Sequence, residues 1–253
     1  MSANYSNYVD KGQIGFWDHL DELRSRVVLC LWIFFGGFIA FYFLSDHILD
    51  FLRKPLFDAL PEGQRRLYYT SLFENFHVHL KVSAYASLAL LSPVYFKVMW
   101  SFVGPGLKPH EKRGVQPFLW AGATFFILGS TFAYFVLLPV GVRYFLSYGT
   151  SAEAPMLTLE AYVDMMVRLL GGFGICFEIP VVMILLGRLG FLTADQLSAQ
   201  RKTAIISIAV LAAIVAPPDA LSMIILMVPL YLFFESSIWF VRRMELRRAA
   251  IKS

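Results

Sequence analysis

Residues 16–26, Phe-Trp-Asp-His-Leu-Asp-Glu-Leu-Arg-Ser-Arg, form a charged segment that stands immediately before the first long apolar run of the chain. Apolar residues recur on one helical face of this segment, at Leu20, Leu23 and Val27. Because the charged residues fall on another face, the pattern predicts a short amphipathic helix at a membrane surface, with Glu22 near the point where the chain enters the bilayer. A solvated helix start in which Glu22 only pairs with Arg26 explains the same pattern.

The composition of the whole chain is that of an integral membrane protein. Its 253 residues are 58% hydrophobic and only 16% charged, and its mean hydropathy is +0.61, values that soluble domains of this size do not normally reach. The N-terminus lacks the pattern of a removable signal, so we expect the first apolar run to remain in the mature protein. The basic residues behind the net charge of +4 stand beside apolar runs, which favours anionic lipid over nucleic acid as their partner.

Apolar runs long enough to cross a bilayer, which takes about 20 residues of helix, recur along the chain. We expect six transmembrane helices, at about 25–45, 76–103, 115–138, 160–187, 203–217 and 220–241. The predicted fold is an all-α integral membrane protein in which residues 1–253 form a single domain. Cys30 and Cys176 both lie in these runs, and they suggest neither a disulfide nor a metal or redox pair.

Capping signals and one short apolar run refine these limits. Capping boxes at 71–74 and 193–196 predict the start of the second helix and of a short turn before the fifth. The fifth run, from Thr203 to Ala216, has only 14 residues, which is about 21 Å of helix against a hydrocarbon core of about 30 Å. We therefore expect the last two helices to form a short hairpin, with Asp219 in its turn either under a thinned bilayer or in a water-filled recess.

The distribution of Lys and Arg around the predicted helices gives the expected orientation. With the N-terminus inside the cell, the inner segments contain 14 Lys and Arg residues and the outer segments contain five. Four of those five lie in the first outer loop, between residues 46 and 72, where Asp and Glu accompany them. Both termini are therefore expected on the cytoplasmic side.

Motifs for common enzyme and cofactor chemistry are missing from the sequence. There is no Walker A pattern, no HExxH and no GxSxG. His77 and His79 stand two residues apart, which directs them to different faces of a helix, so they are not expected to share a metal ion. The stretch Gly171-Gly172-Phe173-Gly174 indicates close helix packing rather than a phosphate loop. We expect neither ATP hydrolysis nor intramembrane proteolysis, and no cofactor and no metal; that no reaction is catalysed at all is implied only by the family resemblance described below.

Charged side chains within or beside the predicted spans are candidate functional groups, because a charge at the bilayer centre costs about 2.5–3.5 kcal/mol even on the lenient insertion scale. They are Lys81, Arg168, Glu178 and Asp219. Glu178 is the clearest, since Pro180 is expected to bend its helix and leave the acid on a concave side. We expect Glu178 to line a membrane-embedded recess, with the fifth and sixth helices as its low wall. A protonated or paired carboxyl that only orders the bundle is the alternative.

Five segments together resemble the TatC family, the multispanning receptor subunits of the twin-arginine protein translocase. They are HLDELRSR at 19–26, SPVYFKVMWSFVGPGLKPHEKR at 92–113, FAYFVLLP at 132–139, FGICFEIPV at 173–181 and APPDALS at 216–222. The resemblance covers nearly the whole chain and implies six helices in a curved, glove-like arrangement in the cytoplasmic (inner) membrane. It also implies that folded proteins bearing an Arg-Arg signal peptide are recognised at the cytoplasmic face and exported with the protonmotive force. The implied partners are single-span TatA- and TatB-type subunits, further copies of the same subunit, and membrane lipids.

The resemblance assigns the signal-peptide site to individual residues. Glu22 and Glu111 match the two acids with which family members hold the twin arginines. The neighbours of that patch are matched by Arg24, Arg26, Phe102 and Leu107. A guanidinium is planar and forked, and a carboxylate accepts two parallel hydrogen bonds from it, so two acids at one interface discriminate Arg-Arg from Lys-Lys.

Four further positions match residues that the family uses outside this patch. Pro55 matches a proline of the first outer loop, and Glu178 and Asp219 match polar groups inside the concavity. Met223 departs from the family pattern, because some relatives carry glutamine there, at a position linked to docking of the single-span partner helices.

Two other classes of function follow from the residues alone. One is a proton-coupled small-solute transporter that uses Glu178 and Asp219 as a relay. Transporters of the common type show internal repeats with broken helices at matching places, and the sequence has no such symmetry. The other is a membrane scaffold without cargo, which leaves the acidic groups at the membrane surface unexplained.

Overall fold

The computed structural model describes residues 16–103, 109–147, 156–215 and 220–252, and these are almost entirely helical. The elements are α1 (Phe16–Phe43), α2 (Ser45–Ala59), η1 (Glu62–Gln64), α3 (Glu74–Leu90), α4 (Ser92–Val103), α5 (Pro109–Phe132), η3 (Ala133–Leu137), α6 (Leu138–Leu146), α7 (Leu159–Leu189), α8 (Ala194–Ala199), α9 (Arg201–Val215) and α10 (Ala220–Lys252). Here η1 is a 3₁₀ turn and η3 a π-turn. The expected all-α class is confirmed.

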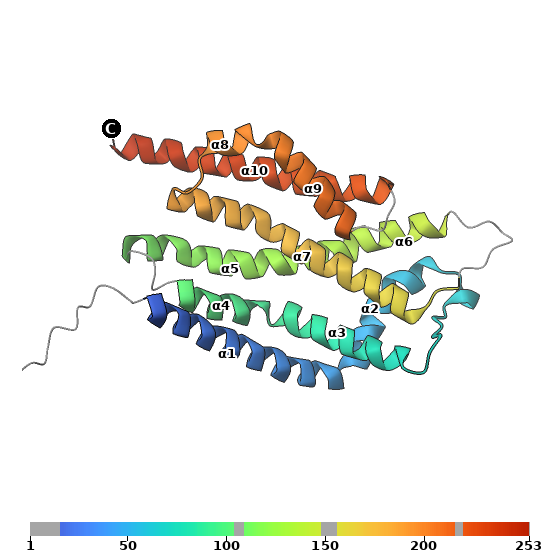
Figure 1. The fold of residues 1–253 in the computed structure, drawn as a ribbon. Helices are drawn as coiled ribbons and strands as arrows, with labels where there is room; N and C mark the ends of the chain where they lie inside the picture. Colours follow the sequence, from blue (N-terminus) through green and yellow to red (C-terminus); the bar gives the residue numbers. More distant parts are fainter. Residues whose placement is uncertain (1–15, 104–108, 148–155, 216–219, 253) are drawn as a thin grey trace, which may run out of the picture.

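The long helices lie side by side in a row that leads from α1 to α10 (Figure 1). α1 packs on α3 and α4, α5 packs on α4 and α7, and α7 packs on α10, which also contacts α9. The short elements α2 and α6 gather at one end of this bundle (Figure 1). The N-terminal end of α1 and the C-terminal end of α10 both lie at the opposite end.

Each predicted span corresponds to a described helix or helix pair. Within the described ranges, four helices are long and apolar enough to cross a membrane singly: Leu20–Phe43, Trp120–Leu146, Leu159–Leu189 and Met223–Arg248. α9 has 15 residues and is as short as expected, but α10 has 33. The two last helices are therefore not both short. α10 continues past 241 because its basic tail consists mostly of good helix formers.

The second predicted helix is divided into α3 and α4, which meet at a bend of 55°. Only the two together are long and apolar enough to cross a membrane. Pro93 has no N–H with which to bond the Ala89 carbonyl oxygen four residues back. Ser92 Oγ donates to that oxygen instead, at 2.7 Å. The expectation of one unbroken helix over 76–103 is wrong because this proline interrupts the hydrogen-bond ladder.

The third predicted helix, expected at 115–138, is longer in the structure. The segments α5, η3 and α6 follow one another without a break from Pro109 to Leu146. In η3 the Leu138 N–H bonds the Ala133 carbonyl oxygen five residues back, which inserts an extra residue into the turn just before Pro139. The helix thus accommodates a proline that cannot donate to the regular ladder.

The two predicted capping boxes have different outcomes. Thr193 and Gln196 form theirs, with each side chain bonded to the other's backbone N–H. At 71–74 the box does not form, because the Glu74 carboxylate binds elsewhere. It is buried and accepts hydrogen bonds from Thr70 N and Thr70 Oγ1, and from Glu160 N in the first turn of α7 at 3.1 Å. Glu74 therefore ties the start of α3 to the start of α7.

Glycines bring α5 and α7 into close contact. A Cβ at Gly129 would lie 2.5 Å from the Phe173 carbonyl oxygen, and a Cβ at Gly174 would lie 2.8 Å from the Phe126 ring. Ser130 Oγ donates across this contact to the Leu170 carbonyl oxygen at 3.1 Å. The close helix packing expected at 171–174 is confirmed, and it places α7 in the centre of the core.

α1 lies at the edge of the row, and none of its apolar window is buried within the protein. Trp32, for example, is 73% exposed. The helix is held where Ser87 Oγ of α3 donates to the Phe34 carbonyl oxygen at 3.0 Å. Gly37 allows this approach, because a Cβ there would lie 2.5 Å from Ser87 Oγ.

The α5–α7 contact predicts opposite results for two glycine substitutions. Gly129→Ala should destabilise the protein by about 1–3 kcal/mol, because a backbone carbonyl cannot move out of the way of the new methyl group. Gly141→Ala is the matched control, since nothing lies within 4 Å of its Cβ position, and it should be neutral or stabilising by up to about 1 kcal/mol. Thermal unfolding of the purified protein in detergent measures both, and equal effects would contradict the packing described.

Candidate functional site

The N-terminal end of α1 carries the acid predicted to bind a ligand. Glu22 Oε1 accepts a hydrogen bond from Arg26 Nη2 at 3.3 Å, and the two side chains are 24% and 34% exposed. Arg24 is exposed on the same helix. The distance is longer than the 2.7–2.9 Å usual for a charge-assisted bond, and the pair spans one turn as the sequence predicted. Glu22 is thus held by one long bond and is partly accessible to solvent.

Two other residues predicted for this patch lie on helices whose ends are at the same end of the bundle (Figure 1). Phe102 is half-buried in the last turn of α4, and Glu111 lies in the first turn of α5. α4 contacts both α1 and α5. The side chain of Glu111, and Leu107 altogether, lie outside the described part of the chain. The structure therefore brings together the helices that carry the predicted patch.

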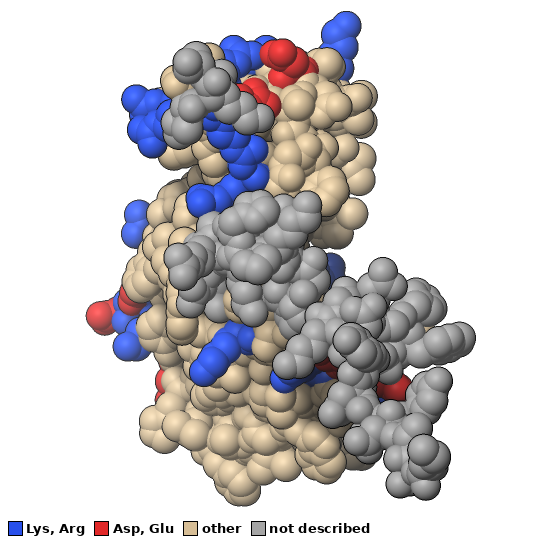
Figure 2. Space-filling model, turned by 90° about the vertical axis from the view of Figure 1, so that its left-hand side faces the viewer, with Lys and Arg blue, Asp and Glu red and all other residues tan. Residues whose placement is uncertain are grey.

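Basic side chains gather on this end of the bundle, mainly in its upper part in the view of Figure 2. Arg201 at the start of α9 binds Glu235 of α10 with two hydrogen bonds, from Nε at 2.7 Å and from Nη2 at 3.0 Å. The Arg243 guanidinium lies 4.7 Å from the centre of the Trp239 ring. Such Arg and Trp pairs are typical of helices that leave a membrane, and the Arg201 pair fixes α9 to α10.

Glu178 faces α5. A Cβ at Gly122 would lie 3.1 Å from Glu178 Oε2 and 2.8 Å from the Phe96 ring of α4. Glu178 Oε1 is buried and has no hydrogen-bond partner among the described residues. An unpaired polar atom in such a place is costly, so Glu178 requires an explanation that the packing of the described residues does not give.

The α9–α10 hairpin packs on a different side of α7. Gly172 lies against Val215 of α9, and Gly187 lies against Val241 of α10. Positions 172 and 178 are six residues apart, which is about 120° around the helix. The expectation that this hairpin forms the low wall beside Glu178 does not agree with the packing, because a bend at a proline does not tell which neighbour the acid will face.

The two remaining candidates of the hairpin lie near its turn. Asp219 falls outside the described residues. Met223, in the first turns of α10, is half-buried and packs against the apolar core formed around α7. The Met223 side chain therefore contacts the core and is also partly accessible from outside the protein.

Pro55 interrupts α2, and two tyrosines from other helices bind the carbonyl groups beside the interruption. A residue other than proline at 55 would donate its N–H to the Phe51 carbonyl oxygen. Tyr134 Oη donates to that oxygen at 2.6 Å, and Tyr162 Oη donates to the Leu52 carbonyl oxygen at 2.8 Å. The Tyr134 ring also stacks on Phe51, with 4.5 Å between centroids. Pro55 thus frees the Phe51 carbonyl oxygen, and α2 is fixed to the bundle through this acceptor and the Leu52 carbonyl oxygen.

An ion-pair cluster between α3 and α7 was not predicted from the sequence. Lys81 Nζ lies 2.7 Å from Glu160 Oε1 and 2.8 Å from Asp164 Oδ1 of α7. Lys81 therefore faces protein groups, as a charge near a membrane must. Arg168, one turn beyond Asp164, is exposed. The spacing of the two acids suits one helix face, but the sequence has no signal that pairs them with Lys81, 79 residues before Glu160.

This arrangement of helices and residues can be compared with known proteins. A family model described as "Sec-independent protein translocase protein (TatC)" matches residues 18–229. The chain belongs to the TatC family. As a member of it, the protein is a multi-pass membrane component of the twin-arginine translocase, and it is a transport subunit rather than an enzyme. Membership of TatC favours this function over the solute transporter.

TatC relatives and solved TatC structures cover most of the chain. A TatC protein of Magnetococcus marinus is 37% identical over 232 residues, 92% of this chain and 85% of its own length. A TatC protein of Aquifex aeolicus is 34% identical, over 88% of this chain and 92% of its own length. A crystal structure of the twin-arginine translocase receptor TatC in DDM has a TM-score of 0.80 and 31% identity, and the match covers 88% of this chain and 99% of the other.

The carbonyl groups beside Pro55 predict a coupling between substitutions. Tyr134→Phe should destabilise the protein by about 1–3 kcal/mol, because the Phe51 carbonyl oxygen, in a partly buried position, loses its donor. In the Pro55→Ala background the new N–H supplies that donor, so the same change should cost much less. Urea unfolding in detergent measures the cycle, with the exposed Tyr69→Phe as control. Additive effects of Pro55→Ala and Tyr134→Phe would show that the two sites are independent.

Proposed function

We propose that this protein is the receptor subunit that binds the Arg-Arg signal peptides of folded cargo proteins and exports them across the cytoplasmic membrane with the protonmotive force. The proposal depends on one observation above all, the loosely held carboxylate of Glu22 at an end of the bundle that also carries the termini of α4 and α5. Membership of the TatC family and the likeness to a solved receptor support it.

The pair between Glu22 and Arg26 suits exchange for an incoming arginine. A surface pair one turn apart on a helix contributes only about 0.3–0.5 kcal/mol, and its 3.3 Å bond leaves the second carboxylate oxygen available. A signal-peptide guanidinium that binds both oxygens in parallel forms the stronger, bidentate arrangement. In the absence of a signal peptide, the Arg26 guanidinium then occupies the position that a signal-peptide arginine would take at Glu22. The peptide displaces it at a small cost in free energy.

A second acid explains why two arginines are required. Glu111 lies in the first turn of α5, next along the row to the α4 helix that contacts α1. Two carboxylates on helices that both contact α4 would each take one guanidinium, whereas lysine ammonium groups cannot bind them in the same forked geometry. We assign Arg24, Phe102 and Leu107 to the rim of this patch.

The orientation that this function requires places the patch inside the cell. Both the N-terminal end of α1 and the C-terminal end of α10 lie at the end of the bundle where the patch lies (Figure 1), and the basic residues gather there (Figure 2). By the positive-inside rule that end is cytoplasmic. Single-span TatA- and TatB-type subunits are the expected partners, with Met223 near the start of α10 and Asp219 as candidate contacts.

Glu178 has a separate role in this proposal. Its buried Oε1 has no partner among the described residues, and its other carboxylate oxygen lies near Gly122 of α5 rather than against the hairpin. A polar group of a partner helix or of the translocated segment would satisfy it. Binding of the signal peptide and transport should therefore be separable.

The first prediction from this proposal concerns binding. The Glu22→Ala, Glu111→Ala double variant should lose affinity for an Arg-Arg signal peptide, by about 1.5–3 kcal/mol for each acid, because each guanidinium loses a charged acceptor. Asp21→Ala is the control, since Asp21 is exposed beside Glu22 on another face. Fluorescence binding of a labelled peptide to the protein in nanodiscs measures this, with a Lys-Lys peptide as reference. Unchanged affinity of the double variant would remove the site.

The second prediction concerns transport. Glu178→Ala should keep signal-peptide affinity but reduce export of a folded cargo, because the group that engages a partner is lost. Glu178→Gln, which keeps the shape and the hydrogen-bonding amide, should retain more export than the alanine variant. An alanine variant with normal export and a higher unfolding temperature would mean that Glu178 is only a costly buried group.

The third prediction concerns orientation. A reporter fused after Ser253 should be active only in its cytoplasmic form, and a cysteine placed at Glu62 in η1 should react with a membrane-impermeant maleimide added outside the cell. These results follow from 14 basic residues on one side against five on the other. An external C-terminal tag would reverse the orientation and place the Glu22 patch outside.

A further inference from the structure

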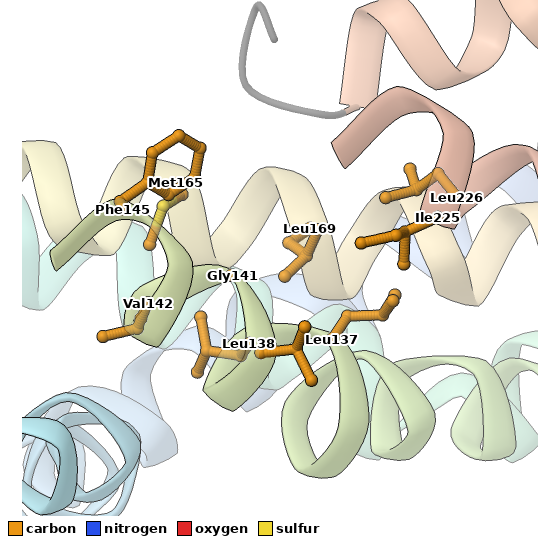
Figure 3. A pocket seen from close by; sticks show the side chains of 10 residues that line it. Leu137, Leu138, Gly141, Val142, Phe145, Met165, Leu169, Ile225 and Leu226 are labelled. Atoms are coloured by element: carbon orange, nitrogen blue, oxygen red, sulfur yellow. The ribbon is translucent and has the colours of Figure 1, made fainter. Parts of the chain in front are cut away.

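A cavity of about 370 Å³ opens between α2, α3, α5 and η3, away from the Glu22 patch. Its walls are apolar for the most part, with Phe51 and Leu52 from α2, Ala86 and Ala89 from α3, and Phe126 from α5 among them. It is far larger than a second pocket, the 40 Å³ space between α6, α7 and α10 in Figure 3, which is too small for more than a few atoms.

Three of the polar side chains that line this cavity are bonded within the protein. Tyr85 Oη donates to Ser130 Oγ at 3.2 Å, Ser130 Oγ donates to the Leu170 carbonyl oxygen at 3.1 Å, and Tyr134 Oη donates to the Phe51 carbonyl oxygen at 2.6 Å. His47 and Thr131 also line the cavity and are exposed. The rest of the wall is apolar and suits an apolar chain.

The rim of the cavity faces the bilayer. Leu90, Ile127 and Phe135 line it and are 60%, 43% and 64% exposed. Ile127 and Phe135 belong to the Trp120–Leu146 span, so the opening lies at the depth of the lipid chains. An occupant can enter sideways from the membrane.

The contacts between the helices around the cavity favour a lipid chain over a helix as its occupant. α3 and α5 contact each other directly, and each also packs on α4 and α7. A helix with its side chains is about 10–12 Å across, and it cannot enter between two helices that already touch. A single acyl chain is narrow enough to follow the groove.

One cationic side chain stands where a lipid headgroup would lie. The Lys54 ammonium is 6.0 Å from the centre of the Phe51 ring, which forms part of the cavity wall. Lys54 is exposed and can bind a phosphate. We propose that the cavity between α2, α3 and α5 is a phospholipid site, with one acyl chain in the groove and the headgroup phosphate at Lys54.

A photoreactive lipid tests the site. The full-length protein is placed in vesicles of phosphatidylcholine that contain phosphatidylglycerol with a diazirine in one acyl chain, irradiated and digested, and the labelled residues are identified by mass spectrometry. Labels should concentrate on the lining residues of α3 and α5. Labelling spread evenly over all exposed surface, including the face of α1 around Trp32, would overturn the proposal.

Matched variants separate the cavity from general lipid contact. Ala89→Phe fills the groove and should lower labelling of the cavity residues several-fold, as should Thr131→Phe, which fills it from an exposed position on α5. Ala213→Phe on the exposed face of α9 should change nothing there. Undiminished labelling in both filling variants would overturn the acyl-chain site. Labelling that Lys54→Ala leaves unchanged would overturn the headgroup contact, and displacement of the lipid by a single-span subunit would identify a protein occupant instead.

Discussion

A backbone carbonyl that is kept away from water, by protein or by lipid, must be bonded within the protein, and this constraint connects the irregular parts of the bundle. Several prolines lie in the described helices, and at three of them, Pro55, Pro93 and Pro139, the lost donor is compensated in a different way. Beside Pro55 a tyrosine from η3 binds the carbonyl oxygen, before Pro93 a neighbouring serine binds it, and before Pro139 the helix widens by one residue. The docking of α2, the bend between α3 and α4 and the course of α5 into α6 all follow from these compensations.

The helical elements were largely predictable from local signals. Apolar runs give the spans, and Thr193 and Gln196 identify a real capping box, because both kinds of signal act within a few residues of the chain. The errors arose where a distant group decided the outcome. Glu74 could not complete its expected box because Thr70 and the start of α7 occupy its carboxylate. The length of α10 depended on a basic tail that hydropathy does not detect.

The candidate site shows the same division. Glu22 and its pairing with Arg26 follow from spacing on one helix. The direction in which Glu178 points could not be known in advance, since it depends on Gly122 and on the side of α7 that α5 occupies. Tyr134 and Tyr162 were not singled out at all, because their role depends on acceptors some 80 and 110 positions earlier in the chain, the Phe51 carbonyl oxygen that Pro55 leaves without a helical donor and the neighbouring Leu52 carbonyl oxygen.

The exposed surface of α1 also has a consequence for how the chain is made. None of the apolar window of α1 is buried within the protein, so this helix is about as stable in lipid alone as in the finished bundle. It can therefore remain in the bilayer without a partner helix while the later spans are synthesised. α7 cannot do so, because 44% of its window is buried and its acids at 160 and 164 depend on Lys81. Biosynthesis from the N-terminus supplies that lysine, and the glycine face of α5, before α7 arrives.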